Sequence, residues 1–309
     1  MTPKADPISA HIQETTLMHP AIQAWRIFLR DQGRSHHTLK AFTADLNLLE
    51  SYFPTDKQVG QITTADLENF LNWMEKERDV PCSPKTLSRR ITSMKSFFRW
   101  LFEAGVLKTN PADAIIQKPV ANRLPHALSQ RECEIALEAA KALYEGAKAD
   151  ARPLTLFMLV LETALKKGEC LNLMTEHLEI DNPQEAALYV RYSNPRFRYK
   201  ERRVPLSKEW VDIYQDYAQK YQIKDQVFPW SQRRLEYLLS DITEAAKLEK
   251  NISFDSLRWT SAVLDLADGV DPDTIRQKLG ISKIQWRDVY ERLRKLAKEF
   301  GYTVPTPQE

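Results

Sequence analysis

Basic side chains gather in three stretches of this sequence, with a spacing that suits contact with phosphate groups. The first stretch has five basic residues and no acidic one: Lys85, Arg89, Arg90, Lys95 and Arg99. Because Lys85 and Arg89 are four residues apart, with Thr86 and Arg90 beside them, they would share one face of a helix. A positive helix face of this kind can position a phosphate backbone.

The other two stretches lie further along the chain. One sets six basic residues against a single acid, Glu201: Arg191, Arg196, Arg198, Lys200, Arg202 and Arg203. The other is the pair Arg233 and Arg234, next to Ser231 and Gln232. Each stretch alone could be an ordinary solvated surface. Three of them together favour a polyanionic partner, and nucleic acid is the expected one.

Composition narrows the class of protein. The 309 residues include 44 basic and 42 acidic side chains, so the net charge is only +2, and the length suits two domains. The 8 glycines are about a third of average usage, and no glycine-rich phosphate motif occurs, which favours helices over a nucleotide-binding fold. Three distant cysteines predict no disulfide and no metal site, and therefore a cytoplasmic protein. Neither a signal peptide nor a membrane span is predicted.

The periodicity divides the chain into four parts. Residues 1–18 predict a loose arm, and residues 19–107 predict a helical domain. Residues 108–130 carry three prolines and predict a linker. Residues 131–309 predict a second, mainly helical domain.

Periodicity and capping signals mark four helices in the first domain. The first begins at Ala21 and ends at Gly33. Ser35 or Thr38 caps the second helix, a capping box at Thr64 opens the third, and the fourth begins at Ser83 and ends at Gly105. Short loops between four helices predict a compact bundle.

In the second domain, residues 132–146 predict a helix. Residues 154–170 predict a strongly apolar helix that must be buried. Residues 178–207 alternate in short β-branched and aromatic pieces between Asn-Pro turns, which predicts a two- or three-stranded antiparallel sheet. Helices then resume to about residue 300.

Several segments resemble the tyrosine recombinases, the phage-integrase and Xer-like family, over residues 20–300. In the first domain they are SHHTLKAFTADLNLLESYF and SPKTLSRRITSMKSFFRWLFEAGVLKTNPADAI, and LPHALSQRECEIAL follows the linker. In the second they are TALKKGECLNL, KERRVPLS, FDSLRWTSAV and LGISKIQWRDVY. The resemblance implies a mainly α fold: an N-terminal SAM-like four-helix core-binding domain, then an α-rich catalytic-type domain with a small antiparallel sheet.

The resemblance also implies a reaction. In this family a tyrosine attacks a DNA phosphodiester and leaves a 3′-phosphotyrosyl link and a free 5′-hydroxyl. Two arginines hold the phosphate, a hairpin lysine protonates the leaving oxygen, and two histidines assist. The reaction needs no metal and no cofactor. Tyr290 falls on the place of the nucleophile, and Arg258 on that of the second arginine.

The remaining catalytic places are altered. Lys166 stands at the first arginine, and lysine cannot make the planar two-pronged grip on phosphate. Phe197 stands at the general-acid lysine, although a shifted hairpin could present Lys200 instead. Asp255 and Ile281 stand at the two histidines, and no histidine follows His177. The active site is therefore expected to be degenerate.

The helix carrying Lys85 and the basic hairpin are the expected DNA-binding elements. The full set of expected contacts is Thr38, Lys40, Lys85, Thr86, Arg89, Arg90, Lys95, Arg196, Arg198, Arg202, Arg233 and Arg234. Phe97, Phe98, Trp100 and Leu101 are expected to pack inward on the same helix.

These observations predict a protein that binds double-stranded DNA in integration or recombination with impaired catalysis. As a pseudoenzyme it would serve as an accessory or site-binding factor, beside a partner recombinase or within a mobile element. The alternative is an active recombinase with Tyr290 as nucleophile. A third reading, a protein-interaction module that has left DNA, would require neutralised surfaces. Residues 291–301 either dock on a neighbouring copy, giving an oligomer on DNA, or pack on their own domain.

Overall fold

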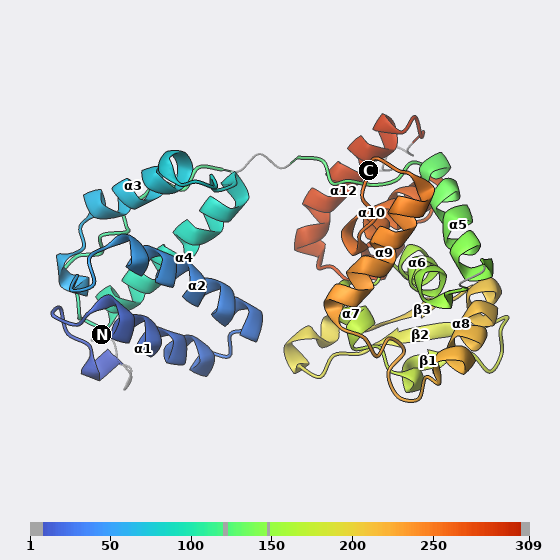
Figure 1. Cartoon of the computed structure of the whole chain (residues 1–309), viewed down its shortest axis with the longest axis horizontal. Coiled ribbons are helices and arrows are strands. Elements are labelled where there is room, and N and C mark those ends of the chain that lie inside the picture. Colours follow the sequence, from blue (N-terminus) through green and yellow to red (C-terminus); the bar gives the residue numbers. More distant parts are fainter. Residues whose placement is uncertain (1–8, 120–122, 147–148, 304–309) are drawn as a thin grey trace. The chain divides into compact units, whose positions relative to one another are not determined.

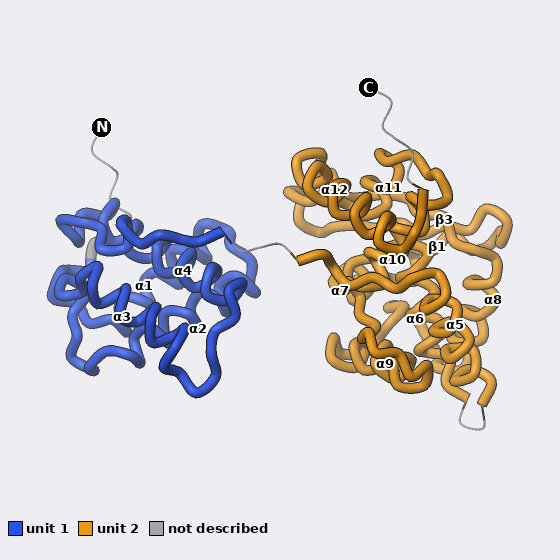
Figure 2. Tube along the Cα trace, turned by 90° about the horizontal axis from the view of Figure 1, so that it is seen from above, with its two compact units in different colours: residues 1–122 blue, residues 123–309 orange. Residues whose placement is uncertain are grey.

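The structure is a computed structural model that describes residues 9–119, 123–146 and 149–303. The chain forms two compact units, residues 1–122 and 123–309, coloured separately in Figure 2. Each unit has its own hydrophobic core. The fold is mainly helical with one small antiparallel sheet, as the sequence predicts.

The first unit is a four-helix bundle, which confirms the predicted fold of this part (Figure 1). Its helices are α1 (Met18–Asp31), α2 (His36–Tyr52), α3 (Thr64–Asn72) and α4 (Pro84–Glu103). Shorter turns are the 3-10 helices η1 (Ser9–His11) and η2 (Val59–Gln61) and the π-helical turn η3 (Trp73–Glu77).

Side-chain caps set where these helices begin. The hydroxyl of Ser35 accepts a bond from the Thr38 amide at the start of α2, and Ser83 caps α4. Helix α3 begins at Thr64, as predicted, but the predicted capping residue is wrong by one position. Thr63, not Thr64, is the cap, because its hydroxyl accepts from the Asp66 amide while the Asp66 carboxylate accepts from the Thr63 amide.

The core of the first unit turns α4 so that its basic side faces outward. Trp25 is fully buried, with its ring 5.6 Å from Phe97 and 6.0 Å from Phe42 between centroids. Phe97, Phe98, Trp100 and Leu101 are all buried, which confirms the predicted inward face. Burial of each such side chain stabilises the fold by about 1.5–3 kcal/mol, so this orientation of α4 is fixed.

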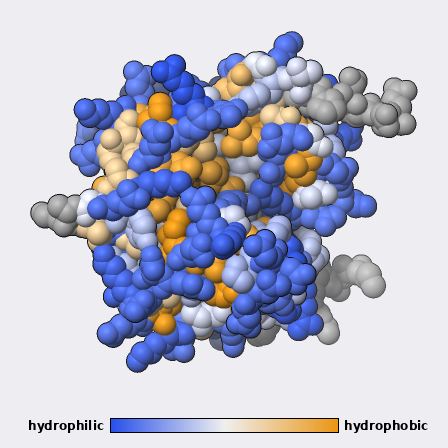
Figure 3. All heavy atoms as spheres, turned by 90° about the vertical axis from the view of Figure 1, so that its right-hand side faces the viewer, coloured by the Kyte–Doolittle hydropathy of each residue, from blue (hydrophilic) through white to orange (hydrophobic). Residues whose placement is uncertain are grey.

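The second unit packs its helices around a buried α6. The helices are α5 (Gln130–Glu145), α6 (Ala151–Thr163), α7 (Lys167–Leu171), α8 (Lys208–Tyr221), α9 (Gln232–Ala246), α10 (Phe254–Ala267), α11 (Pro272–Leu279) and α12 (Lys283–Glu299). Helix α6 packs against α5, α8, α9 and α10. Figure 3 views the side bearing α5 and α8, where hydrophilic residues cover most of the surface.

A three-stranded antiparallel sheet lies beside these helices. Its strands are β1 (Leu178–Glu179), β2 (Ala187–Val190) and β3 (Arg202–Pro205), in that spatial order. The 3-10 turn η4 (Thr175–His177) precedes β1, and η5 (Pro195–Lys200) lies between β2 and β3. Val190 pairs with Arg202, so η5 belongs to the connection of this hairpin.

The apolar segment at residues 154–170 is not one helix, as its pattern predicts, but two. Helix α6 ends at Thr163 because Ala164 adopts a left-handed conformation with φ of 51°. The chain then starts α7 with Lys166 as its N-cap residue. Apolar periodicity continues through Leu165, which is also buried, and so the sequence pattern does not reveal the break.

The segment predicted as a linker contributes to both cores. Ala112 and Ile115 are buried in the first unit, and Ala127 and Leu128 in the second. Residues 120–122 lie outside the described part of the chain. At the other end, the segment 291–301 packs on its own unit, where α12 lies against α10 and buries Leu293 and Leu296.

Candidate functional site

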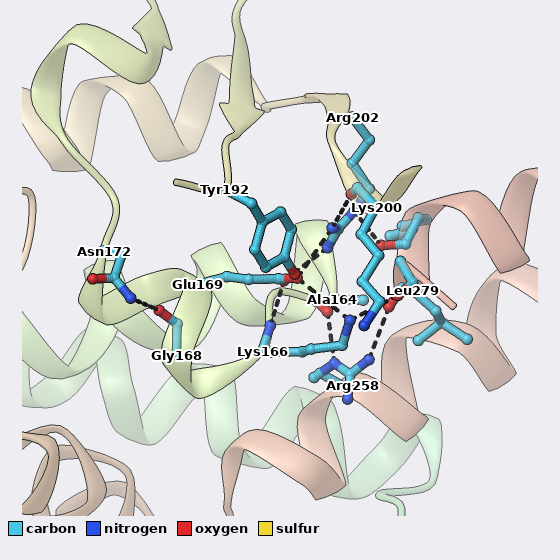
Figure 4. A network of polar contacts seen from close by, with 12 residues as sticks. Ala164, Lys166, Gly168, Glu169, Asn172, Tyr192, Lys200, Arg202, Arg258 and Leu279 are labelled. Atoms are coloured by element: carbon cyan, nitrogen blue, oxygen red, sulfur yellow. Dashed lines mark hydrogen bonds and ion pairs between the residues drawn. The ribbon is translucent and has the colours of Figure 1, made fainter. Parts of the chain in front are cut away.

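Three cations hold the C-terminal turn of α11 by consecutive backbone carbonyls. Arg202 Nε donates to the oxygen of Lys278 at 2.9 Å, and Arg258 Nη2 donates to that of Leu279 at 3.0 Å. Lys166 Nζ donates to the oxygen of Gly280 at 2.7 Å. The C-terminus of a helix carries partial negative charge, so it attracts cations. Figure 4 shows Lys166, Arg202 and Arg258 gathered around this turn.

Gly280 permits this close approach. Its φ of 59° is left-handed, and a Cβ atom there would lie 2.6 Å from Arg202 Nη1 and 3.3 Å from Lys166 Nζ. Any side chain would therefore strain the backbone and displace both cations.

Glu169 is the buried anion that organises the site. Its side chain is 4% exposed and accepts two bonds from Arg202, at 2.9 and 3.2 Å, while the Arg202 side chain is 8% exposed. The Lys166 amide donates to it at 2.8 Å, and the Tyr192 hydroxyl also donates to it. Burial alone would raise the pKa of Glu169, but the bonds and charge of Arg202 and the charge of Lys166 outweigh burial and lower it to about 2.

Glu169 was not among the residues expected from the sequence. Its signal is the spacing of Lys166 and Glu169, the N-cap and third residue of α7, where a glutamate accepts a bond from the N-cap amide. The same carboxylate binds Arg202, one of the expected DNA contacts. Its guanidinium is therefore buried and paired in this structure, and its contact with DNA stays a prediction.

Arg258 is also turned inward. Besides Leu279, its Nε donates to the oxygen of Ala164 at 2.7 Å, which ties α10 to the break after α6. No ion pair joins Arg258 to Asp255 within the described residues, although they are three positions apart. Burial lowers the pKa of Lys166 to about 8, because the cost of burying the ammonium and the charges of Arg258 and Arg202 outweigh the attraction of Glu169.

Lys200 reaches the same place from the hairpin. Its side chain points toward those of Lys166 and Arg258 (Figure 4), and its charge contributes to the lowered pKa of Lys166. Its ammonium also lies 4.7 Å from the ring centre of Phe197 and 5.3 Å from that of Tyr199. The structure thus brings together three of the four residues singled out as catalytic from the sequence.

Tyr290, the fourth, lies on α12. Its ring packs on Trp286, with centroids 5.3 Å apart, and the side chain is half-buried. Within the described residues its hydroxyl makes no hydrogen bond. The three altered positions differ in exposure: Phe197 and Asp255 are exposed, and Ile281 packs partly against the small core that holds α12.

A cavity of about 540 Å³ opens beside these residues, lined by Lys166, Arg258 and Asp255 together with side chains of α9. A carboxylate in this cavity opposes a phosphate, because like charges repel. No group of His, Cys, Asp and Glu in the described residues is arranged to hold a metal ion. Among those residues, no helix is long and apolar enough to cross a lipid bilayer.

One buried acid from a neighbouring helix contacts the basic residues of α4. Asp45 on α2 is 5% exposed and accepts bonds from Arg89 and from Ser93, while Arg90 lies 3.5 Å away. Arg90 points inward and also contacts sulfur atoms of the core. Arg89 keeps 40% of its side chain exposed.

The other expected DNA contacts lie at the surface or half-buried. Within the described residues no ion pair engages the side chains of Lys40, Lys85, Lys95, Arg196, Arg198, Arg233 or Arg234. Thr38 and Thr86 bond to the residues that cap α2 and α4. Arg233 donates to the Tyr237 hydroxyl at 2.7 Å.

Comparison with known families identifies the same two units. The model for the N-terminal SAM-like domain of phage integrases matches residues 22–105, and the model for the phage integrase family matches residues 127–296. Among curated proteins, the tyrosine recombinase XerC of Pediococcus pentosaceus is 23% identical over 283 residues, which cover 87% of this chain and 91% of that protein.

Solved structures share the fold. XerH site-specific recombinase bound to its palindromic difH substrate, in a post-cleavage complex, matches with a TM-score of 0.71 and 17% identity over 91% of this chain and 82% of that one. A lambda integrase dimer bound to a COC′ core site matches with a TM-score of 0.69 and 16% identity, over 99% and 84% respectively. At these identities the likeness concerns the fold alone.

Proposed function

The chain belongs to the phage integrase family, and from this premise we propose that it binds duplex DNA in site-specific recombination or integration, with impaired strand cleavage. Both units carry exposed cations without an acidic partner in the described residues, among them Lys40 and Lys85 in the first and Arg196 and Arg198 in the second. Such side chains supply phosphate contacts. The XerH and lambda integrase structures are complexes with DNA, which supports the same partner here.

The evidence for impaired strand cleavage is the set of side chains that line the cavity at Lys166. Asp255 stands there with Arg258, where the family has a histidine, and a carboxylate repels the phosphate that Arg258 would hold. Ile281 offers no proton and no hydrogen bond at the place of the other histidine. Loss of one transition-state donor typically slows an enzyme by about 10²–10³.

The ammonium of Lys166 adds to this impairment. Its bonds to Gly280 and Glu169 occupy two of the three N–H donors of the ammonium. The one that remains cannot replace the two-pronged grip of a guanidinium.

An active recombinase is the second candidate, and the position of Lys200 favours it. Although Phe197 occupies the general-acid place, Lys200 points to Lys166 and Arg258 (Figure 4). In this case the Tyr290 hydroxyl loses its proton to water as its oxygen bonds to the phosphorus. Lys200 donates a proton to the 5′-oxygen as the bond from phosphorus to that oxygen breaks.

We also propose the cellular compartment of the protein and its partners. The three cysteines are free thiols, which suits a reducing compartment, and we place the protein in the cytoplasm. It would act as a site-binding or accessory factor, as an oligomer on DNA or beside a partner recombinase, including one carried by a mobile element.

Duplex binding as a function of salt tests the DNA-binding proposal. The logarithm of affinity should fall linearly with the logarithm of salt concentration, and Lys85→Ala should lower the slope by about 1 while leaving the fold intact. Lys76→Ala is the matched control, since Lys76 is an exposed lysine of the same unit outside the proposed interface. Absence of duplex binding at low salt would refute the proposal.

A nicked suicide duplex tests the impairment. Such a substrate traps a covalent protein–DNA adduct when strand cleavage occurs. We expect at most a trace of adduct, and none with Tyr290→Phe. Rapid, complete trapping by the unaltered protein would instead establish the second candidate.

A further inference from the structure

The connection between β2 and β3 presents aromatic rings to solvent. Its 3-10 turn η5 alternates basic and aromatic side chains in the order Arg196, Phe197, Arg198, Tyr199 and Lys200. Phe197 is 39% exposed and Tyr199 is 66% exposed. Large apolar rings are usually buried on folding, so two exposed rings on one short turn require an explanation.

Lys200 ties the two rings together. Its ammonium lies within 5.3 Å of both ring centres, a distance at which a cation is attracted to a ring face. Arg196 and Arg198 lie on the same turn, exposed and without an ion pair in the described residues. We call Phe197 and Tyr199 the ring pair, and Lys200 is the lysine that contacts both rings.

The turn is anchored to the interior by its flanks. The Asn194 side chain accepts a bond from the Arg196 amide at 3.0 Å and caps η5. The Tyr192 ring lies 5.8 Å from that of Phe197, and its hydroxyl donates to Glu169. The Glu201 carboxylate accepts from the Tyr192 amide at 2.9 Å. Because Tyr192 packs on Phe197 and bonds to Glu169, the buried Glu169 carboxylate that holds Arg202 also positions the ring pair.

We propose that the ring pair stacks on unpaired bases of DNA, next to a phosphate at Lys166 and Arg258. The substrate class is then duplex DNA that carries unpaired or unstacked bases, as in a bulge or a fork. This inference rests on the proposed function, because it requires that the chain binds DNA. Arg196 and Arg198 contact phosphates on either side of the exposed base.

The chemistry favours unpaired bases over an intact duplex. In a paired helix the faces of the bases are covered by their neighbours, and only base edges and phosphates are accessible in the grooves. A Phe or Tyr ring offers no charged donor to those edges. Both can stack on a base whose face is free, and such stacking interleaved with basic side chains is typical of single-strand recognition.

The test compares two labelled DNAs of equal length at one salt concentration by fluorescence anisotropy. One is a fully paired duplex, and the other carries a bulge of unpaired thymines at its centre. The proteins are the unaltered chain, the double variant Phe197→Leu with Tyr199→Leu, and Phe102→Leu. Leucine keeps an apolar side chain but has no ring face. Phe102 is an exposed phenylalanine of the first unit, 45% exposed, and is the matched control.

We expect the unaltered chain and Phe102→Leu to prefer the bulged DNA by about tenfold or more. The double variant should lose this preference while its affinity for the paired duplex changes by less than about twofold. Equal affinity of the unaltered chain for both DNAs would overturn the inference and leave the proposed function standing. An equal loss on both DNAs in the double variant would also overturn it. Absence of binding to either DNA would refute the proposed function itself.

Discussion

Replacement of Glu169 by glutamine tests the organisation of the site most severely. The substitution keeps the shape of the side chain but removes the charge that neutralises Arg202 and Lys166, both of which remain near the interior. When one partner of a buried ion pair is removed, the other charge is left uncompensated, and the cost is typically about 3–5 kcal/mol.

The pKa of Glu169 gives an independent magnitude. Its fall from 4.5 to about 2 corresponds to about 3 kcal/mol, at roughly 1.4 kcal/mol per unit. Because the folded pKa is lowered, this stabilisation is present above pH 4.5 and is lost as the pH falls toward 2. Glu169→Gln should therefore lower the free energy of unfolding by about 3 kcal/mol at neutral pH, and by progressively less in acid.

Urea unfolding followed by circular dichroism measures this difference. The matched control is Glu236→Gln, which removes the exposed carboxylate that pairs with Lys167 at 2.6 Å, and it should change the free energy of unfolding by less than about 1 kcal/mol. If Glu169→Gln costs no more than this control, or costs the same at every pH, Glu169 does not organise the site as we describe.

Three further predictions concern other parts of the molecule. Asp45→Ala should lower the free energy of unfolding by about 3 kcal/mol or more, because Arg89 and Arg90 lose their buried acid; a urea titration that shows no change would contradict this. Duplex affinity should fall as the pH rises through about 8, where Lys166 loses its charge, and Lys166→Arg should abolish this fall. Fluorescence anisotropy at fixed salt measures both affinities. The same fall in the variant would show that another group causes it. Tyr290→Phe should leave the melting temperature unchanged, since the hydroxyl has no partner in the described residues; a clear drop in calorimetry would show a structural role.

The helices of the first unit could be predicted because local rules determine them. Apolar spacing in α4 gives the inward face of Phe97 and Leu101, and Ser83 followed by Pro84 gives its start. The small sheet follows from the alternation of β-branched and aromatic residues. The resemblance to a family adds the order of these elements and the places of Arg258 and Tyr290.

The buried charges could not be predicted in the same way. Arg202 and Glu169 are 33 positions apart, and whether an arginine faces solvent or a distant carboxylate depends on tertiary packing. Asp45 likewise meets Arg89 across two helices. A count of basic residues along the chain therefore overstates the charge available to DNA, and it cannot distinguish a cation that holds the fold from one that is free.

The break after α6 escaped prediction for a related reason. Ala164 has no residue-specific preference for a left-handed backbone, and its conformation is imposed by the packing of α6 and by the bond that its carbonyl accepts from Arg258. The place of Lys166 in the site depends on that single conformation.

The proposed function requires that Lys166 and Arg258 still hold a phosphate in the cavity, although proton transfer there is inefficient. A suicide duplex with sulfur in place of the bridging 5′-oxygen tests it directly, because a thiolate leaves without needing a proton. We predict that the protein traps an adduct through Tyr290 on the sulfur-containing duplex and far less on the ordinary one. Equal trapping on both duplexes, or no adduct on either, would contradict the claim.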